Sequence, residues 1–303
     1  MKTVNELKRS LDKKYQGMVK PGSEIELKKI PVPSITLNRA LGGGFGRGRI
    51  NMIYGTKSAA KTSMLLQMIA DAQKEGLTCV LIDAEQSFEP IWAAKLGVDV
   101  ESLLVVQAKT FAEAIDIGVA LLEEGIDLLV VDSISSLIPG SYFGKNGDVK
   151  ESSETNQMGS VAQATQKMVF MYNYANTDTC IMLISQNRNK LTPVGAIQIP
   201  TGGEAVKYFS STIVKVTASA SEKEQIMEKR NGLEVPIGRK VSFRVEWSKT
   251  SNAGIRGDFN FYYGTDTPGI DRVAEVVDLA VKLGFIRVAG AWHYRDDNIK
   301  FQG

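Results

Sequence analysis

The chain has 303 residues and a formal net charge of +2, and 43% of its residues are hydrophobic while 23% are charged. This composition is typical of a soluble protein with one large domain, and the near-neutral charge means that any DNA contact needs a local patch. A single histidine excludes a multi-histidine metal site, and no apolar run is long enough to cross a membrane.

The first 33 residues are expected to form a peripheral segment. Val4, Leu7 and Leu11 recur at helical spacing among charged residues, which predicts a short amphipathic helix over residues 3–14. Its apolar stripe packs either on its own core or on a neighbouring subunit. A linker at 21–23, an extended piece at 28–33, a helical turn at 36–41 and a glycine-rich bend at 42–48 follow.

The next stretch has the pattern of a phosphate-binding loop. An apolar run at 50–54 predicts a buried strand, and residues 63–72 repeat apolar side chains at helical spacing. Backbone N–H groups of such a loop can bind an anion, Lys61 can reach the β- and γ-phosphates, and the Thr62 hydroxyl can ligate Mg²⁺. The expected nucleotide contacts here are Gly55, Thr56, Lys57, Ser58, Ala59, Ala60, Lys61, Thr62 and Ser63.

Ala60 departs from the usual pattern, which has glycine before the lysine. Because alanine tolerates helical dihedral angles, we expect the loop to keep its shape unless this position needs a positive φ. An ordinary strand-to-helix turn with a chance Lys-Thr pair is the alternative interpretation.

Beyond the loop, predicted strands and helices alternate. Strands are expected at 78–83, 103–107, 127–132 and 179–185, and helices at 90–96, 111–123 and 160–176. Continuous apolar strands between helices indicate an α/β fold with a mostly parallel, twisted sheet covered by helices on both faces. Cys79 and Cys180 lie inside two of these strands, which favours core packing and a reduced, cytosolic setting.

Polar residues follow three of the predicted strands, at the carboxyl ends of the strands, where parallel sheets usually bind their ligands. Asp132 suits Mg²⁺ ligation beside a phosphate loop, since Mg²⁺ prefers hard oxygen ligands. Glu85 is the candidate base for the attacking water, and Gln186 can hydrogen-bond a γ-phosphate or its water. A capped strand end is the alternative interpretation of each residue taken alone.

These motifs resemble the RecA family of homologous recombinases, and the similarity covers essentially the whole chain. The divergent loop favours phage-encoded versions as its closer relatives. The stretches that carry the resemblance are residues 34–42, 82–99, 131–133, 201–207 and 290–292. The resemblance implies a short N-terminal oligomerisation helix with its linker at residues 1–33, which contact another protomer, and a RecA-like P-loop NTPase core at residues 34–268. It also implies a small α+β lobe, minimal or truncated, at residues 269–303.

The resemblance also implies roles for single residues. It makes Glu85 the catalytic carboxylate and Gln186 the γ-phosphate sensor that couples ATP to DNA affinity, with Lys61 and Lys249 completing the catalytic set. Contacts with the adenine are implied for Glu89, Trp92, Tyr263 and Gly264. Trp92 stands where the family usually has tyrosine, and a tryptophan face stacks at least as well.

Two segments, about 140–159 and 187–201, resemble the family's loops for single-stranded DNA. We expect both to be flexible and irregular, because long loops in a compact domain are usually functional or disordered. Basic side chains would hold phosphates while an apolar side chain wedges between bases. The implied DNA contacts are Met158, Gly159, Arg188, Lys190, Ile197, Ile199, Thr201, Gly202 and Gly203.

One departure concerns the residues that reach the neighbouring subunit's γ-phosphate. The family places two lysines there, two residues apart, and this chain has Trp247 and Lys249. Only Lys249 matches, so hydrolysis activated across the interface is expected to be weaker or assisted by Arg244. The family's DNA-facing arginines after Gly159 are also not matched one for one.

The resulting hypothesis is an ATP- and Mg²⁺-dependent DNA recombinase in the cytoplasm of a bacterium or a bacterial host. It polymerises on single-stranded DNA as a helical homo-oligomer, pairs that strand with homologous duplex DNA, and hydrolyses ATP when DNA is bound. Single-strand-binding and loader proteins are further expected partners, and a membrane is not. Three alternatives stay open: a helicase or other DNA motor on the same core, a filament protein with little hydrolysis, and a small-molecule kinase.

Overall fold

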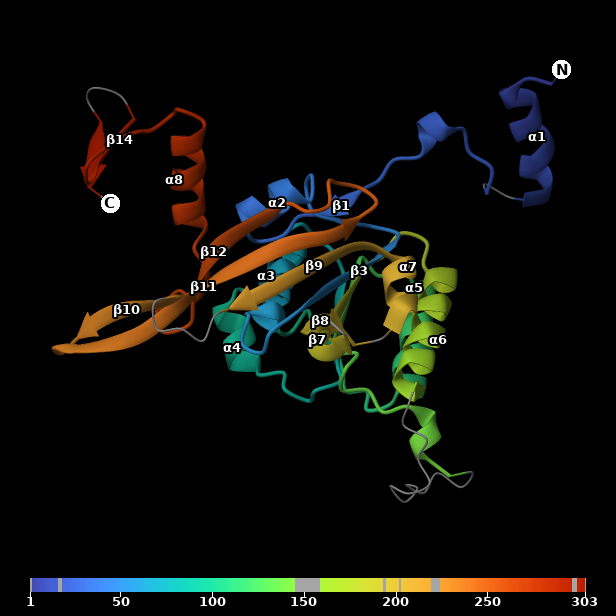
Figure 1. Ribbon diagram of the computed structural model, residues 1–303. Coiled ribbons are helices and arrows are strands. Elements are labelled where there is room, and N and C mark those ends of the chain that lie inside the picture. Colours follow the sequence, from blue (N-terminus) through green and yellow to red (C-terminus); the bar gives the residue numbers. More distant parts are fainter. Residues whose placement is uncertain are drawn as a thin grey trace.

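The continuous apolar runs of the sequence form the centre of a large sheet. The computed structural model describes residues 2–15, 18–144, 159–192, 195–201, 203–218, 224–295 and 299–302. Neighbouring strands run parallel in the order β9-β3-β7-β6-β4-β5, and Figure 1 labels the first three of them. Their bounds are β3 (Arg49–Gly55), β4 (Cys79–Asp83), β5 (Leu104–Val106), β6 (Leu128–Asp132), β7 (Cys180–Thr192) and β9 (Ser210–Ala218). Because these strands are parallel, their carboxyl ends meet at one edge of the sheet.

Antiparallel strands that are not among the predicted elements extend the sheet beyond β9. β11 (Leu233–Ser248) pairs with β9 and with β12 (Arg256–Tyr262), which pairs with β13 (Gly269–Ile270). β10 (Gln225–Arg230) forms a hairpin with β11 that projects from the sheet in Figure 1. β11 alternates buried Val241 and Phe243 with exposed Ser242 and Arg244, as expected of a strand with one covered face.

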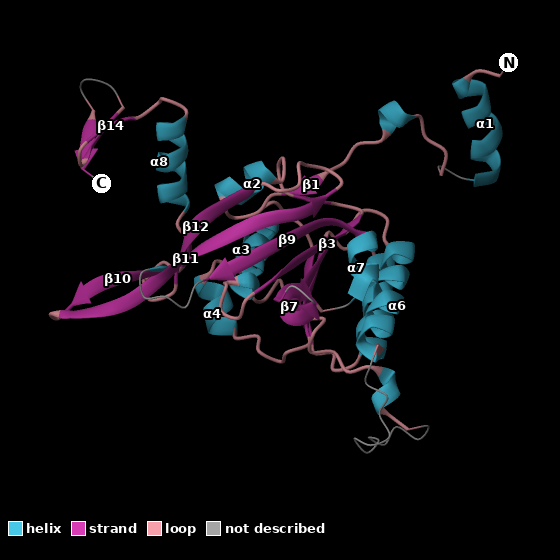
Figure 2. Ribbon diagram, viewed as in Figure 1, coloured by secondary structure: helices cyan, strands magenta, loops and turns pink. Residues whose placement is uncertain are grey.

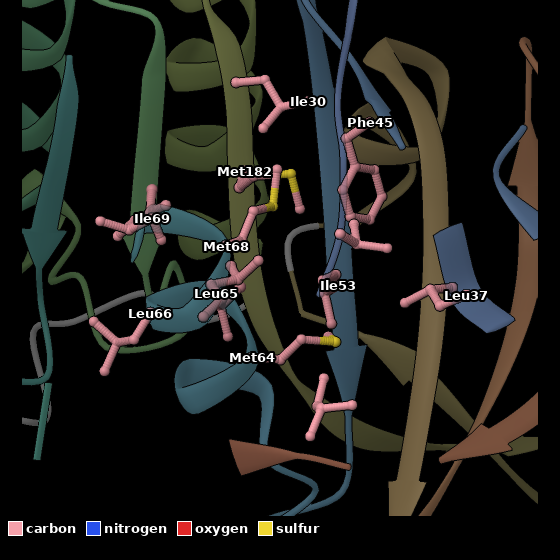
Figure 3. Packing of buried hydrophobic residues seen from close by; sticks show 14 of the residues in the cluster. Ile30, Leu37, Phe45, Ile53, Met64, Leu65, Leu66, Met68, Ile69 and Met182 are labelled. Carbon is pink, nitrogen blue, oxygen red and sulfur yellow. The ribbon is translucent and has the colours of Figure 1, made fainter. Parts of the chain in front are cut away.

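Helices cover both faces of the sheet. On one face α3 (Lys61–Lys74) packs with α2 (Ile35–Ala40) and α4 (Pro90–Lys95), and on the other lie α5 (Phe111–Glu123), α6 (Ser160–Ala175) and α7 (Gly203–Phe209). Figure 3 shows the first layer, in which Met68 of α3 lies beside Met182 of β7, and Met64 beside Ile53 of β3. Burial on both faces fixes the strands, and with them the positions of the residues at their ends.

Smaller elements lie at the periphery. Figure 1 shows α1 (Val4–Tyr15) set apart from the sheet, and the apolar side chains of Val4, Leu7 and Leu11 on it are exposed. The chain reaches β3 through η1 (Gly22–Glu24), β1 (Lys29–Ile30), α2 and β2 (Phe45–Gly46). After β13, α8 (Arg272–Lys282) leads to a small antiparallel sheet, visible beside α8 in Figure 2, of β14 (Arg287–Ala289), β15 (Trp292–Tyr294) and β16 (Lys300–Gln302). Within the described ranges, no helix is both long and apolar enough to span a bilayer.

The predicted α/β fold class is confirmed, because a mostly parallel core sheet lies between helical layers and a small antiparallel sheet follows near the end of the chain. The expectation of an irregular segment at 187–201 is wrong for its backbone. β7 continues past the sheet edge and pairs antiparallel with β8 (Gly195–Pro200), with Arg188 opposite Ile199 and Lys190 opposite Ile197. Basic residues two apart and apolar residues two apart have the period of a strand, and this period explains the hairpin.

The other predicted DNA-binding segment, about 140–159, is described only at its two ends. η2 (Gly140–Tyr142) opens it, and Gly159 closes it as the N-cap of α6. Residues 145–158 lie outside the described residues.

Candidate functional site

The predicted phosphate loop is anchored on β9 as well as on its own strand. The Thr56 N–H donates to Val216 O (3.3 Å), and the Ala218 N–H donates to the Thr56 hydroxyl (3.1 Å). Gly55 lies so close to β9 that a Cβ atom there would sit 1.7 Å from Val216 O, a contact that only glycine avoids. The loop therefore leaves the sheet from a fixed point.

Two residues of the loop have a left-handed backbone. Ser58 has a φ of +61°, and Ala60, the N-cap of α3, has a φ of +55° and a ψ of +24°. Position 60 therefore does have a positive φ, so the exception named for Ala60 in the expectation above applies. Glycine enters this region freely, whereas another L-residue is disfavoured by about 1–2 kcal/mol.

Lys61 begins α3 with its ammonium group turned back toward the loop. Its Nζ donates to Thr56 O (2.7 Å) and to Gly55 O (3.3 Å), and the residue is buried. Burial lowers the pKa of Lys61 from its ordinary value, while the carboxylates of Asp132 and Glu85 oppose this shift. A buried cation among loop carbonyls is well placed to bind an incoming phosphate oxygen.

Three strand ends meet this loop at one cavity. The cavity has a volume of about 230 Å³, and it is lined by Glu85 after β4, Asp132 at the end of β6 and Gln186 on β7. The other lining residues are Ile184, Lys57, Ser58, Ala59, Ala60, Lys61, Thr62 and Ser63. The structure thus brings together strand-end residues that lie up to 101 positions apart in the sequence.

Thr62 and Asp132 form a pair of oxygen donors in the cavity. The Thr62 hydroxyl donates to Asp132 Oδ2 at 2.5 Å. Burial raises the pKa of Asp132 to about 6, and the charges of Glu85 and Asp83 act in the same direction. A hydroxyl with one carboxylate suits Mg²⁺, which keeps several waters, and a divalent cation would stabilise the ionised form of Asp132. Among the residues that the structure describes, no cluster of three or more His, Cys, Asp or Glu side chains could enclose a metal ion.

Glu85 is held by two serines to which the sequence analysis assigns no role. Its Oε1 accepts hydrogen bonds from the hydroxyls of Ser133 (2.7 Å) and Ser136 (3.3 Å) and from Nε2 of Gln186 (3.0 Å). Both serines lie in the turn after β6, and serine is too common in turns to signal such a contact. The network fixes one oxygen of Glu85 and joins it to Gln186.

The residues expected at the adenine do not line the cavity at the loop. Glu89 caps the N-terminus of α4 with its carboxylate, and the half-buried Trp92 donates from Nε1 to Ser63 Oγ (3.2 Å). Tyr263, which is also half-buried, and Gly264 follow β12. Trp92 is therefore connected to the first turn of α3, the same turn that carries Lys61 and Thr62.

The β7–β8 hairpin is joined to the cavity through Gln186. Thr201, just past β8, donates its N–H and its hydroxyl to Gln186 O, each at 3.3 Å, while the Gln186 N–H donates to Ser135 Oγ (3.0 Å). Gln186 therefore contacts Glu85 with its side chain and the base of the hairpin with its backbone.

The remaining residues with a predicted DNA contact are placed in part. Gly159 has a φ of +92°, Ile199 is half-buried in β8, and Gly203 begins α7. The backbone of Arg188, Lys190 and Ile197 lies within the hairpin, and their side chains lie outside the described part of the structure. Outside the described residues are Met158 and Gly202.

Lys249 and Trp247 lie near the amino-terminal ends of the parallel strands, whereas the phosphate loop of the same chain lies at their carboxyl-terminal ends. Ser248 of β11 and Asn51 of β3 both pair with the same residue of β9, so they lie at the same height in the sheet. Asn51 precedes Gly55 by four residues, which is a distance of about 13 Å along the strand at roughly 3.3 Å per residue. Lys249 Nζ donates to a carbonyl near the end of α7 (3.1 Å), and Trp247 is 47% exposed. Neither residue lines the cavity at its own loop.

A further contact links this end of β11 to the start of the loop. The Tyr54 hydroxyl donates to Glu246 Oε2, and burial together with this hydrogen bond raises the pKa of Tyr54 above its ordinary value. Tyr54 directly precedes Gly55, and Glu246 directly precedes Trp247. The entry to the loop and the far end of β11 are therefore in direct contact.

Comparison with known proteins gives consistent matches along the chain. A family model described as RecA N-terminal domain matches residues 2–267. Protein RecA of Teredinibacter turnerae is 38% identical over 298 residues, which are 95% of this chain and 82% of that protein. Protein RecA of Chlorobaculum parvum is 36% identical over 271 residues, 88% of this chain and 74% of the relative. Protein RecA of Rickettsia bellii is 34% identical over 272 residues, 88% of this chain and 75% of the relative.

Proposed function

This chain belongs to the RecA family, and from that premise we propose how its own residues perform the family's reaction. The protein is an ATP-dependent DNA recombinase that polymerises on single-stranded DNA and catalyses homologous pairing and strand exchange. Its ATPase activity depends on DNA.

The convergence of Lys61, Glu85, Asp132 and Gln186 on one cavity is the observation that supports the nucleotide site. We propose that ATP phosphates bind over the loop and the N-terminus of α3, where backbone N–H groups and the helix dipole favour an anion. Lys61 then exchanges its bonds to the loop carbonyls for bonds to the β- and γ-phosphates. The residues proposed to contact the adenine are Glu89, Trp92, Tyr263 and Gly264.

Mg²⁺ is the proposed metal cofactor, and Thr62 and Asp132 are the residues that would hold it. When bound, it neutralises charge on the phosphates. The hydrogen bond between these two oxygen donors and their shared position in the cavity lining support the assignment.

Glu85 is the proposed general base for the attacking water. Its Oε1 accepts the hydrogen bonds of Ser133, Ser136 and Gln186, and these contacts orient the carboxylate at the cavity wall. A positioned carboxylate base is typically worth about 10²–10⁴-fold in rate. The serines therefore serve to orient Glu85 and not to react.

Gln186 is the proposed connection between nucleotide and DNA. Its side chain contacts Glu85, and its carbonyl accepts from Thr201 at the base of the β7–β8 hairpin. A γ-phosphate that competes for the Gln186 amide would displace this strand, and a shift of the strand moves the hairpin that carries Arg188 and Lys190. DNA affinity then depends on which nucleotide is bound, as linkage between two sites requires.

Lys249 is proposed to act on the nucleotide of the adjacent protomer. Its position at the sheet edge remote from its own loop supports this role, because a side chain cannot cover that distance within one chain. A cation from a neighbouring subunit stabilises the charge that develops on the γ-phosphate in the transition state.

The chain is proposed to consist of three parts. We propose that residues 1–33 contact the next protomer, and the exposed apolar stripe of α1 supports this role. Residues 34–268 are the proposed ATPase core and residues 269–303 the proposed C-terminal lobe. Segments 140–159 and 187–201 are the proposed sites for single-stranded DNA, and single-strand-binding and loader proteins are proposed partners in the cytoplasm.

The nucleotide site is tested by Lys61→Ala. We expect this variant to lose ATP affinity and ATP-dependent binding to single-stranded DNA, while its circular dichroism spectrum matches the wild type. Lys74→Ala, at the other end of α3, is the matched control, because Lys74 is exposed and forms a surface ion pair with Asp71. Unchanged ATP affinity in Lys61→Ala would refute the phosphate-loop assignment.

A further inference from the structure

Arg239 connects β11 to the phosphate loop across 181 positions of sequence. Its Nη1 donates to the backbone carbonyl of Ser58 at 3.2 Å. The guanidinium also lies over the ring of Tyr263, 5.6 Å from the ring centroid. Arg239 is half-buried, and it is absent from the lining of the cavity beneath the loop. It therefore contacts the loop from outside.

We propose that Arg239 is a positioning residue that holds the phosphate loop in its nucleotide-binding conformation. The proposal rests on the nucleotide site proposed above. It concerns a loop that lacks glycine after Gly55, whose residues Ser58 and Ala60 both have a positive φ. Because L-residues other than glycine are disfavoured there, this loop needs contacts that favour the bound conformation over relaxed ones.

Ser58 lies between two ends of the loop that each have an anchor of their own. At one end Thr56 is hydrogen-bonded to β9 in both directions. At the other end Lys61 is part of α3 and donates to Thr56 O. Between these anchors, the Ser58 carbonyl accepts its hydrogen bond from Arg239. The guanidinium therefore supports the middle of the loop, at one of the two left-handed residues.

The chemistry of arginine suits this position. A guanidinium is planar, so it can stack on an aromatic face while its N–H groups donate in its own plane. Tyr263 is itself held by a hydrogen bond from its N–H to Ile237 O (2.8 Å), on the same strand as Arg239. The support is thus attached to the sheet at two points and does not depend on a flexible side chain alone.

The test measures the dissociation constant of ADP, which avoids hydrolysis, in two backgrounds. From the net value of a hydrogen bond and an exposed cation–π contact, we expect Arg239→Met to weaken ADP binding about fivefold. In a Ser58→Gly background, where glycine adopts the positive φ without penalty, the same substitution should weaken binding less than about twofold. Lys240→Met is the matched control, since Lys240 is the next residue on β11 and pairs with Asp258 (2.7 Å). It should leave ADP binding unchanged.

The outcomes separate the possible roles of Arg239. Equal losses in the two backgrounds would mean that the arginine acts on the nucleotide by its charge or through Tyr263, and not through the loop. No loss would mean that it does nothing at this site, and either result overturns the proposal. If the wild type itself fails to bind ADP, the proposed nucleotide site fails first, and this inference with it. Arg239→Gln, which also removes the charge, repeats the comparison if Arg239→Met does not fold.

Discussion

Replacing Ala60 by glycine tests the left-handed conformation at the start of α3. With a φ of +55°, alanine is disfavoured at this position by about 1–2 kcal/mol, and glycine removes that penalty. Glycine also gives the unfolded chain more freedom, which costs about 0.5–1 kcal/mol, and it loses the packing of one half-buried methyl group, a few tenths of a kcal/mol. The difference is a gain in stability of about 0.5 kcal/mol.

The assay is thermal unfolding of the nucleotide-free protein, with Ala120→Gly as the reference. Ala120 is exposed within α5, where glycine costs about 1 kcal/mol because the helix must restrict it. At roughly 2–4 °C per kcal/mol, Ala60→Gly should raise the Tm by about 1–2 °C and Ala120→Gly should lower it by about 2–4 °C. The two identical substitutions are thus expected to have opposite signs.

One result would contradict the prediction that Ala60→Gly raises the Tm. If Ala60→Gly lowers the Tm as much as Ala120→Gly does, then Ala60 has helical dihedral angles and the loop is not strained. In that case the proposal that Arg239 holds a strained loop would also lose its physical basis.

The remaining predictions concern turnover and DNA. Glu85→Gln should keep ATP binding and lose DNA-stimulated hydrolysis, as a steady-state ATPase assay would show; a wild-type rate would assign the base to another residue. Arg188→Ala combined with Lys190→Ala should weaken single-stranded DNA binding for all sequences and reduce the slope of log K against log salt by about 1.4, or 0.7 per contact, and an unchanged slope would place the DNA elsewhere. Lys249→Ala should abolish DNA-stimulated hydrolysis with little change in ATP affinity of the free protomer, whereas Trp247→Lys should raise turnover. Should Trp247→Lys instead lower turnover, and high protein concentration restore it, Trp247 anchors assembly and the missing charge is not limiting.

The parallel core could be predicted because its strands are continuous apolar runs. The run at 50–54 is the centre of β3, and the helix expected at 111–123 has the bounds of α5, which a Thr110–Glu113 capping box fixes at its start. Local chemistry determines such elements, so the sequence alone is sufficient for them. The same holds for Glu85 and Asp132, since the end of a parallel strand fixes where the next residues lie.

The contacts around these residues could not be predicted in the same way. Ser136 reaches Glu85 and Arg239 reaches Ser58 through the pairing of distant strands, and a serine in a turn or an arginine in a strand carries no local mark of its partner. The φ of Ala60 is set by the path from β3 into α3 and not by the preference of alanine. The hairpin at 187–200 was open to prediction from its two-residue period, which the expectation of a loop overlooked.

β11 connects the phosphate loop of its own protomer with the region proposed to act on the next nucleotide. This one strand supports the loop of its own protomer through Arg239 and contacts the entry to that loop through Glu246 and Tyr54. It ends one residue before the lysine proposed to serve the next nucleotide. A shift of β11 on nucleotide binding would therefore also move the lysine that is proposed to serve the next nucleotide. Two neighbouring sites joined in this way would change each other's affinity.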